Sequence, residues 1–153
     1  MPLLMPGNIL NNILKGKLGV ASVWDTDPAN LENMTDGDLA TVTGTGSKVM
    51  GAGGSYGHIT FDLGSVKTVL VGGKVGIWST AGNIYCVLEQ SDNNITWNGD
   101  NGTALNYTTL VEQVSAFRTH LVTCRYFRLR FYVTAASTAY AKIYEVMAWE
   151  LTL

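Results

Sequence analysis

The sequence has 153 residues, of which 46% are hydrophobic and 14% charged, and a formal net charge of −2. These proportions exclude an intrinsically disordered chain and fit one domain with its own hydrophobic core. The ten Lys and Arg residues are scattered, and no apolar run approaches the ~20 residues that cross a bilayer, so neither nucleic-acid binding nor membrane insertion is expected.

Residues 1–18 are predicted to form an arm that leads into a single domain spanning residues 19–153. Pro2, Pro6 and Gly7 interrupt the apolar start of this segment, and its first basic residue, Lys15, follows the apolar stretch. A secretory signal begins with positive charge instead, so we expect the segment to be retained. Such an arm either wraps a neighbouring subunit, closes the bottom of the domain, or frays as a tail.

Short runs with β-strand character recur along the chain between turn-forming segments rich in Gly, Asn and Asp. The first alternates the apolar residues Ile59, Phe61 and Leu63 with polar ones. The later runs cover residues 68–71, 74–78, 83–90, 108–111, 119–122, 125–133 and 139–153. Period-two alternation in short segments, spaced roughly ten residues apart, predicts an all-β fold, either a sandwich or a barrel.

The same alternation predicts which side chains face the core. In the run 125–133, Phe127, Leu129 and Phe131 are expected to point inward, and Tyr126, Arg128 and Arg130 outward. Trp97 and Trp149 are also predicted to lie in the core.

The two cysteines, Cys86 and Cys124, share no zinc-type spacing with His58 and His120. Cys86 occupies one of the alternating apolar positions of the run 83–90, which favours a buried free thiol. A disulfide stays open, because separation along the sequence does not report distance.

No catalytic motif is present, so an enzyme is not expected. The serines lie in turns without the pattern of a nucleophile elbow. The segment 44–47 (GTGS) lacks both the spacing and the following helix of a phosphate-binding loop. The few acidic residues fall largely in turns, which leaves no pair for glycoside hydrolysis.

Sugar sites combine an aromatic platform with a few planar donors and acceptors on loops. The residues expected to bind a ligand are Trp78, Asn83, Tyr56, His58 and Arg118, with Trp24 as a further candidate. Three of them have a second interpretation. Trp78 fits core packing equally well, His58 fits a hydrogen-bonded surface position, and Arg118 fits a solvated side chain.

Four stretches follow one another in an ordered pattern. They read NLENMTDGDLAT (30–41), ITFDLGSVKTV (59–69), LEQSDNNITW (88–97), and RYFRL (125–129) followed by AKIYEV (141–146). In order and spacing they resemble the discoidin-like family (coagulation factor 5/8 C-type, galactose-binding-like). The resemblance covers most of residues 21–150 and implies an eight-stranded antiparallel jelly-roll sandwich.

The sequence also departs from this family. No cysteine lies near either end to form the family's terminal disulfide, and Val42 follows Thr41 where a Trp is common. The long glycine-rich loop expected at residues 44–57 is unlike that of a sugar-binding member. These departures fall near the loops that recognise ligands, so the family's ligand specificity is not carried over.

The resemblance further implies a structural Ca²⁺ beside the first stretch. Ca²⁺ takes about six to eight oxygen ligands. By resemblance, Asp36 supplies a carboxylate, Thr41 a hydroxyl, and Glu145 closes the site. The carbonyls implied as further ligands are those of Asn33, Asp38 and Thr41. The alternative is that Asp36 and Asp38 make Asx turns without a metal.

Two functions are expected from these features. The first is a non-catalytic structural or adhesion subunit on a virion surface, such as a capsid-decoration, head-fibre or tail protein, that contacts copies of itself or other virion proteins and also binds glycans. The retained arm, the low charge and the abundant Gly, Thr and Asn favour it. The alternative is a free carbohydrate-binding module that recognises cell-surface or polysaccharide glycans. Either function places the protein on a virion or outside the cell.

Overall fold

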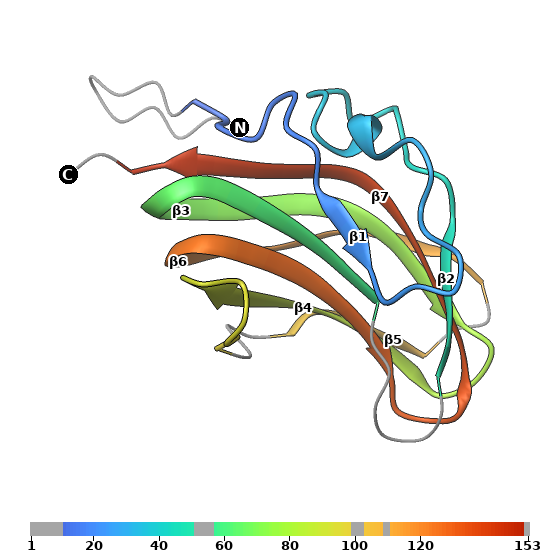
Figure 1. Ribbon diagram of the computed structural model, residues 1–153. Helices are drawn as coiled ribbons and strands as arrows, with labels where there is room; N and C mark the ends of the chain where they lie inside the picture. The colour runs from blue at the N-terminus through green and yellow to red at the C-terminus, as the bar shows by residue number, and fades with distance from the viewer. Residues whose placement is uncertain (1–10, 51–56, 99–102, 109–110, 152–153) are drawn as a thin grey trace.

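The computed structural model describes residues 11–50, 57–98, 103–108 and 111–151, and for residues 50, 103–108 and 117–119 only the backbone. Seven strands and one short 3₁₀ helix make up this part of the chain (Figure 1). They are β1 (Val20–Ser22), η1 (Leu31–Met34), β2 (Gly46–Met50), β3 (Gly57–Ser79), β4 (Asn83–Ser91), β5 (Thr103–Thr108), β6 (Gln113–Val133) and β7 (Ser137–Glu150).

All strand pairs are antiparallel, in the order β2-β7-β3-β6-β4-β5, with β1 beside β3. The long strands β3 and β6 double back on the same side of the molecule (Figure 1). Residues 57–62 of β3 pair with 126–131 of β6, and after a register shift residues 67–77 pair with 113–124. The ladder therefore folds into two layers and forms an antiparallel sandwich, one of the two architectures that the alternation predicted.

The two layers enclose the core. Ile59, Phe61 and Leu63 alternate with outward residues of β3, and the rings of Phe61 and Phe127 stack with centroids 5.0 Å apart. Phe127, Leu129 and Phe131 are fully buried, as predicted. Burying such side chains removes apolar surface from water, and truncating a buried Phe to Ala costs about 3–5 kcal/mol.

Both cysteines are buried free thiols, which settles the alternative left open by the sequence. Burial is the main cause that raises the pKa of the Cys124 thiol to about 11, and it raises the pKa of Cys86 further. Neither thiol is therefore ionised near neutral pH.

The prediction that Trp97 and Trp149 lie in the core was wrong, since both are half-buried. Trp149 follows Ala148, which takes the inward position on β7. Trp24 packs at the edge of the core, with its ring 5.6 Å from that of Phe131. Its Nε1–H donates to the carbonyl of His58 at 3.0 Å, which makes it a packing residue rather than a ligand platform.

The segment before β1 packs against the domain. Leu14 is fully buried in the core, the Ile13 N–H donates to the Ala148 carbonyl at 2.8 Å, and Asn12 Oδ1 accepts the Ala148 N–H at 3.1 Å. Residues 12–17 therefore pack against one end of the sandwich, which fits the second of the three arrangements expected for the arm, and the boundary at residue 18 stays a prediction. Residues 1–10 lie outside the described part.

Across the residues that the structure describes, no helix reaches the length and apolarity that a membrane crossing requires.

Candidate functional site

A groove of about 880 Å³ lies on the outer face of the layer that contains β1 and the first part of β3. Because Ile59 and Phe61 point into the core, their neighbours along β3 point outward. The groove floor consists of His58, Thr60 and Asp62 from β3 and Tyr126 and Arg128 from β6. One wall is formed by residues of the segment 17–23, and the other by Asn94 and Trp97 after β4.

Arg128 is held rigidly under this second wall. Its Nε donates to Glu89 Oε2 at 2.5 Å, and its guanidinium carbon lies 4.1 Å from the centre of the Trp97 ring. Glu89 is only 4% exposed and also pairs with Arg130, Nε to Oε1 3.2 Å. Charge-assisted bonds and cation–π contact of this kind fix the guanidinium and the indole relative to each other.

His58 lies beside Arg128 on the floor, with 3.4 Å between its Nδ1 and Arg128 Nη1. Burial, as the main cause, and the charges of Arg128 and Arg130 together lower its pKa to about 4. The imidazole is therefore neutral at neutral pH and presents one donor and one acceptor nitrogen.

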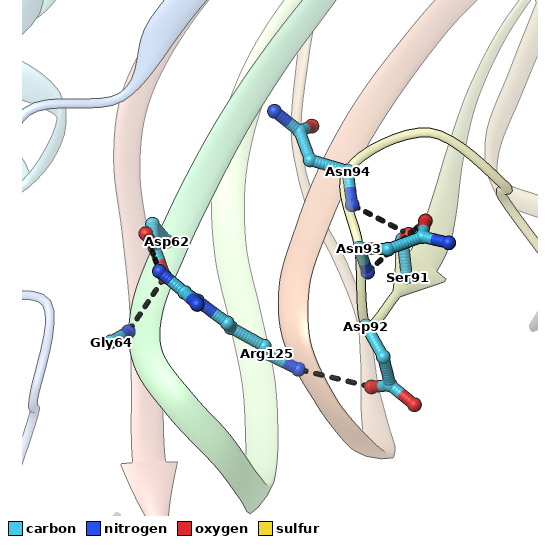
Figure 2. Close-up of polar contacts among 7 residues, drawn as sticks. All are labelled: Asp62, Gly64, Ser91, Asp92, Asn93, Asn94 and Arg125. Atoms are coloured by element: carbon cyan, nitrogen blue, oxygen red, sulfur yellow. Dashed lines mark hydrogen bonds and ion pairs between the residues drawn. The ribbon is translucent and has the colours of Figure 1, made fainter.

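The turn that carries Asn94 is fixed by its own side chains (Figure 2). Ser91 Oγ accepts the N–H groups of Asn93 and Asn94 at 3.3 and 3.0 Å. Asp92 Oδ1 accepts the backbone N–H of Arg125 at 3.3 Å, which joins the turn to β6. Asn94 adopts a left-handed conformation, φ 59°, which Asn tolerates better than most residues.

Of the five residues that the sequence suggested for ligand binding, His58 lines the groove. Trp78 lies on the outer face of the other layer, where its ring stacks on Tyr140 with centroids 5.1 Å apart. Asn83 begins β4, and its backbone N–H donates to Thr134 Oγ1 at 3.2 Å. The structure does not bring Trp78 and His58 together. Tyr56 and the side chain of Arg118 lie outside the description.

The groove residues that the ligand prediction missed include Asn94, Trp97, Tyr126 and Arg128. The outward phase of Tyr126 and Arg128 was a usable signal, because it placed both on the outer face. Trp97 gave no local signal, since its motif is equally compatible with a buried ring.

The residues implied for a cation lie together at the loop that follows η1. Thr41 Oγ1 lies 2.7 Å from Asp36 Oδ2, 2.9 Å from the Asp38 carbonyl oxygen and 3.4 Å from the Asn33 carbonyl oxygen. Glu145 reaches the same loop from β7, where its Oε2 accepts the Gly37 N–H at 3.2 Å. Gly37 has φ +85°, the left-handed region that glycine adopts without strain.

Glu145 is the unusual member of this set. It is 1% exposed, and its Oε1 has no hydrogen-bond partner among the described residues. The pKa of Glu145 is raised to about 7, mainly by burial and also by repulsion from Asp36 and Asp38. The hydrogen bond from Gly37 and the charge of Lys15 act in the opposite direction. An unpartnered buried carboxylate oxygen is costly, and a bound cation would satisfy it.

Asp36 and Asp38 also make the hydrogen bonds of Asx turns, which the sequence offered as the alternative to a metal site. Asp36 Oδ1 accepts the Asp38 N–H and Asp38 Oδ1 accepts the Ala40 N–H, both at 2.8 Å. The described residues hold no metal-binding group of three or more His, Cys, Asp or Glu side chains. The oxygens that converge here are mainly carbonyl and hydroxyl, with Asp38 offering its carbonyl, and such a set fits Ca²⁺ rather than zinc.

No protein-family model matches the sequence. No curated protein matches it either.

Solved structures do match the fold. A variant of chitosan-binding module 1, from a chitosanase/glucanase of Paenibacillus sp. IK-5, is 18% identical and superposes with a TM-score of 0.54 over 92% of this chain and 99% of the module. The module CBM32-3, from a family 31 glycoside hydrolase of Clostridium perfringens, is 16% identical, with a TM-score of 0.53 over 93% and 95%. Another CBM32 module of Clostridium perfringens is 17% identical, with a TM-score of 0.50 over 92% and 100%.

At these identities the similarity concerns the fold. The fold implied by the four sequence stretches is confirmed: the chain has the discoidin-like, galactose-binding-like β-sandwich that these carbohydrate-binding modules share.

Proposed function

We propose that the chain is a non-catalytic carbohydrate-binding module and that the groove holds the glycan. The observation that carries the proposal is the combination of Trp97 and Tyr126 with the planar polar groups of His58, Asn94 and Arg128 in one groove. The fold shared with carbohydrate-binding modules supports it.

This set of side chains suits a sugar. Trp97 offers an apolar surface against which the C–H face of a pyranose packs, while hydroxyl groups need donors and acceptors at its edges. The Asn94 amide supplies both, and the Arg128 guanidinium adds donors. Because Glu89 fixes Arg128 and Arg128 underlies Trp97, the binding groups are ordered before the ligand arrives, which lowers the entropic cost of binding.

The acidic groups near the groove support recognition rather than hydrolysis. Asp62 is engaged by both Nε and Nη2 of Arg125, and Glu89 lies buried between Arg128 and Arg130. A glycosidase needs two carboxyl groups that reach the glycosidic bond, one of them able to give up a proton. Two carboxylates held by arginines are poorly suited to that role.

The fold neighbours carry no information on a virion or assembly role. That role stays a prediction from the sequence, and measuring the oligomeric state by light scattering tests it. A glycan-binding groove is compatible with either outcome.

We also propose that Ca²⁺ occupies the loop 33–41 together with Glu145, as a structural ion. The cation would join the carbonyls of Asn33 and Asp38, Asp36 Oδ2, Thr41 Oγ1 and Glu145 Oε1. When bound it supplies the positive charge that the buried Glu145 carboxylate lacks, and so ties β7 to the loop.

The deciding experiment is a glycan array screened with the whole chain in Ca²⁺, followed by calorimetry on the best ligand. Trp97→Ala should weaken binding at least tenfold, which corresponds to about 1.4 kcal/mol. Trp149→Ala removes an equally half-buried indole outside the groove lining and should leave the affinity within about twofold.

Two results would contradict the proposal. An array without any bound glycan would oppose the function itself. Binding that survives Trp97→Ala but is lost in Trp78→Ala would place the site on the opposite layer, as one interpretation of the sequence had it. Thermal unfolding of each variant confirms that it is folded.

A further inference from the structure

We infer that the ligand of the groove is an acidic glycan, whose carboxylate or sulfate is held between Lys17 and Arg128. This inference rests on the proposed function and names the substrate class of the same site. It follows from the local charge balance, which differs in sign from that of the whole chain.

The side chains that line or support the groove carry more positive than negative charge. The positive ones are Lys17, Arg125, Arg128 and Arg130, and the negative ones are Asp62, Glu89 and Asp92. The surplus is one positive charge, although the chain as a whole has a net charge of −2. An acidic protein that concentrates cations at one groove attracts anions there.

The negative charges are already engaged. Asp62 accepts hydrogen bonds from the Arg125 guanidinium and the Gly64 N–H. Glu89 accepts the Arg128 Nε–H and forms an ion pair with Arg130. Lys17 is exposed and forms no ion pair within the described part of the chain. Its charge helps to lower the pKa of Asp62, but no carboxylate of the described residues lies in ion-pair contact with its ammonium group.

Arg128 supplies the second contact. A guanidinium has five N–H donors in a planar fork, a geometry that matches carboxylate and sulfate. In Arg128, Nε donates to Glu89 and Nη1 contacts His58, while Nη2 has no partner among the described residues. The side chain is 16% exposed and lines the groove, so it is accessible to a ligand.

The pKa of His58 on the groove floor reports the same positive charges of Arg128 and Arg130. After burial, the charges of Arg128 and Arg130 are what keep this imidazole neutral down to acidic pH. The floor thus disfavours an added positive charge, which argues against a cationic amino sugar and for an anionic one.

The test uses pairs of oligosaccharides that differ in charge. The carboxylate pairs are trigalacturonic acid with its methyl ester and 3′-sialyllactose with lactose. The sulfate pair is 6-sulfated N-acetyllactosamine with its unsulfated form, and a chitosan oligomer serves as the cationic probe. Affinities are measured by calorimetry at low and high NaCl.

We expect at least one acidic member to bind tenfold or more tightly than its neutral partner, and higher salt to weaken it. Lys17→Met keeps most of the side-chain stem and should weaken the acidic ligand about three- to tenfold more than its neutral partner. Lys74→Met, on the opposite layer, is the matched control and should change neither.

Tighter binding of the neutral members or of the chitosan oligomer would overturn the inference and leave the proposed function standing. So would acidic binding that Lys17→Met does not alter. If no member of any pair binds, the proposed function fails, and the inference fails with it.

Discussion

Arg125 holds Asp62 through two parallel hydrogen bonds, Nε to Oδ1 and Nη2 to Oδ2, each 3.1 Å long (Figure 2). The pair joins β3 to β6 next to the register shift at which both strands pass from one layer to the other. Asp62 Oδ1 also accepts the Gly64 N–H at 2.7 Å, in a turn where glycine takes φ +85°. The hydrogen bonds from Arg125 are the main reason that the pKa of Asp62 is lowered.

Asp62→Asn should lower the free energy of unfolding by only about 0.5–1 kcal/mol, because exposed ion pairs are weak even when bidentate. The two side chains are 42% and 44% exposed. Urea denaturation measures the loss, and Asp27→Asn, which changes an exposed aspartate outside the ion pairs of the described residues, should be neutral. A loss above about 2 kcal/mol would mean that the turn depends on the Asp62 carboxylate far more than its exposure suggests.

Glu89→Ala should be much more damaging, lowering the free energy of unfolding by about 3 kcal/mol. The substitution leaves Arg128 and Arg130 without their shared, buried carboxylate. Glu150→Ala, which breaks the more exposed pair with Lys67, should cost less than about 1 kcal/mol. Equal effects of the two substitutions in urea denaturation would show that burial does not separate these pairs.

Adding Ca²⁺ to the chelated protein should raise the melting temperature. At about 100 times the Kd, mass action contributes about 2.7 kcal/mol, or about 5–10 °C for a chain of this size. Glu145→Gln should abolish most of this shift, because it removes the buried carboxylate. Glu32→Gln, an exposed acid in η1, should retain it. A melting temperature that Ca²⁺ leaves unchanged in the unsubstituted protein would exclude the ion.

His58 should make stability depend on pH. Its pKa is about 4 in the folded protein, against an ordinary value of 6.5, so between these values the unfolded chain binds a proton that the folded one does not. Stability is thus fully present above pH 6.5 and falls as the pH drops towards 4. For a half-buried ring we expect about 1–2 kcal/mol after solvent screening.

Urea denaturation at neutral pH and at two acidic pH values above the folded pKa tests this expectation, with His58→Gln as the comparison. The carboxylates titrate in both proteins, so the difference between the two pH profiles isolates the histidine. Parallel profiles would mean that the imidazole takes up its proton in the folded state at an ordinary pH.

Leu14→Ala should lower the free energy of unfolding by about 3 kcal/mol, because the side chain is fully buried in the core. Leu18→Ala, at a position that is 64% exposed, should cost less than about 0.5 kcal/mol. A chain that starts at Gly19 also lacks the buried Leu14 side chain, so it should melt at a lower temperature whatever its oligomeric state. A truncated chain of unchanged stability would support the predicted arm boundary at residue 18.

The strands that carry strong alternation were predictable from the sequence. The inward set on β3 includes Ile59 and Phe61, and the inward set on β6 is Phe127, Leu129 and Phe131. Assigning these faces required no tertiary information, because period-two patterning reports burial directly.

The short strands were not predictable in the same way. β1 and β2 have only three and five residues, and β2 lies in the glycine-rich segment that was expected to be a loop. Both exist because a neighbouring strand supplies hydrogen-bond partners, β3 for β1 and β7 for β2. Pairing with a neighbouring strand does not require an alternation of apolar and polar residues within the short strand itself.

By itself the sequence determined the all-β class and the inward faces of the long strands, and its resemblance to the discoidin-like family implied the set of residues around Glu145. The tertiary structure alone decided where the groove lies. His58 and Trp78 were grouped as one site, yet they lie on opposite layers, because β3 turns near Gly64 and carries its two halves into different layers. Trp97, Arg128 and His58 come from distant parts of the chain and meet only through the register of β3, β6 and the turn after β4. Period and propensity are local properties, whereas a groove depends on distances that only the folded chain defines.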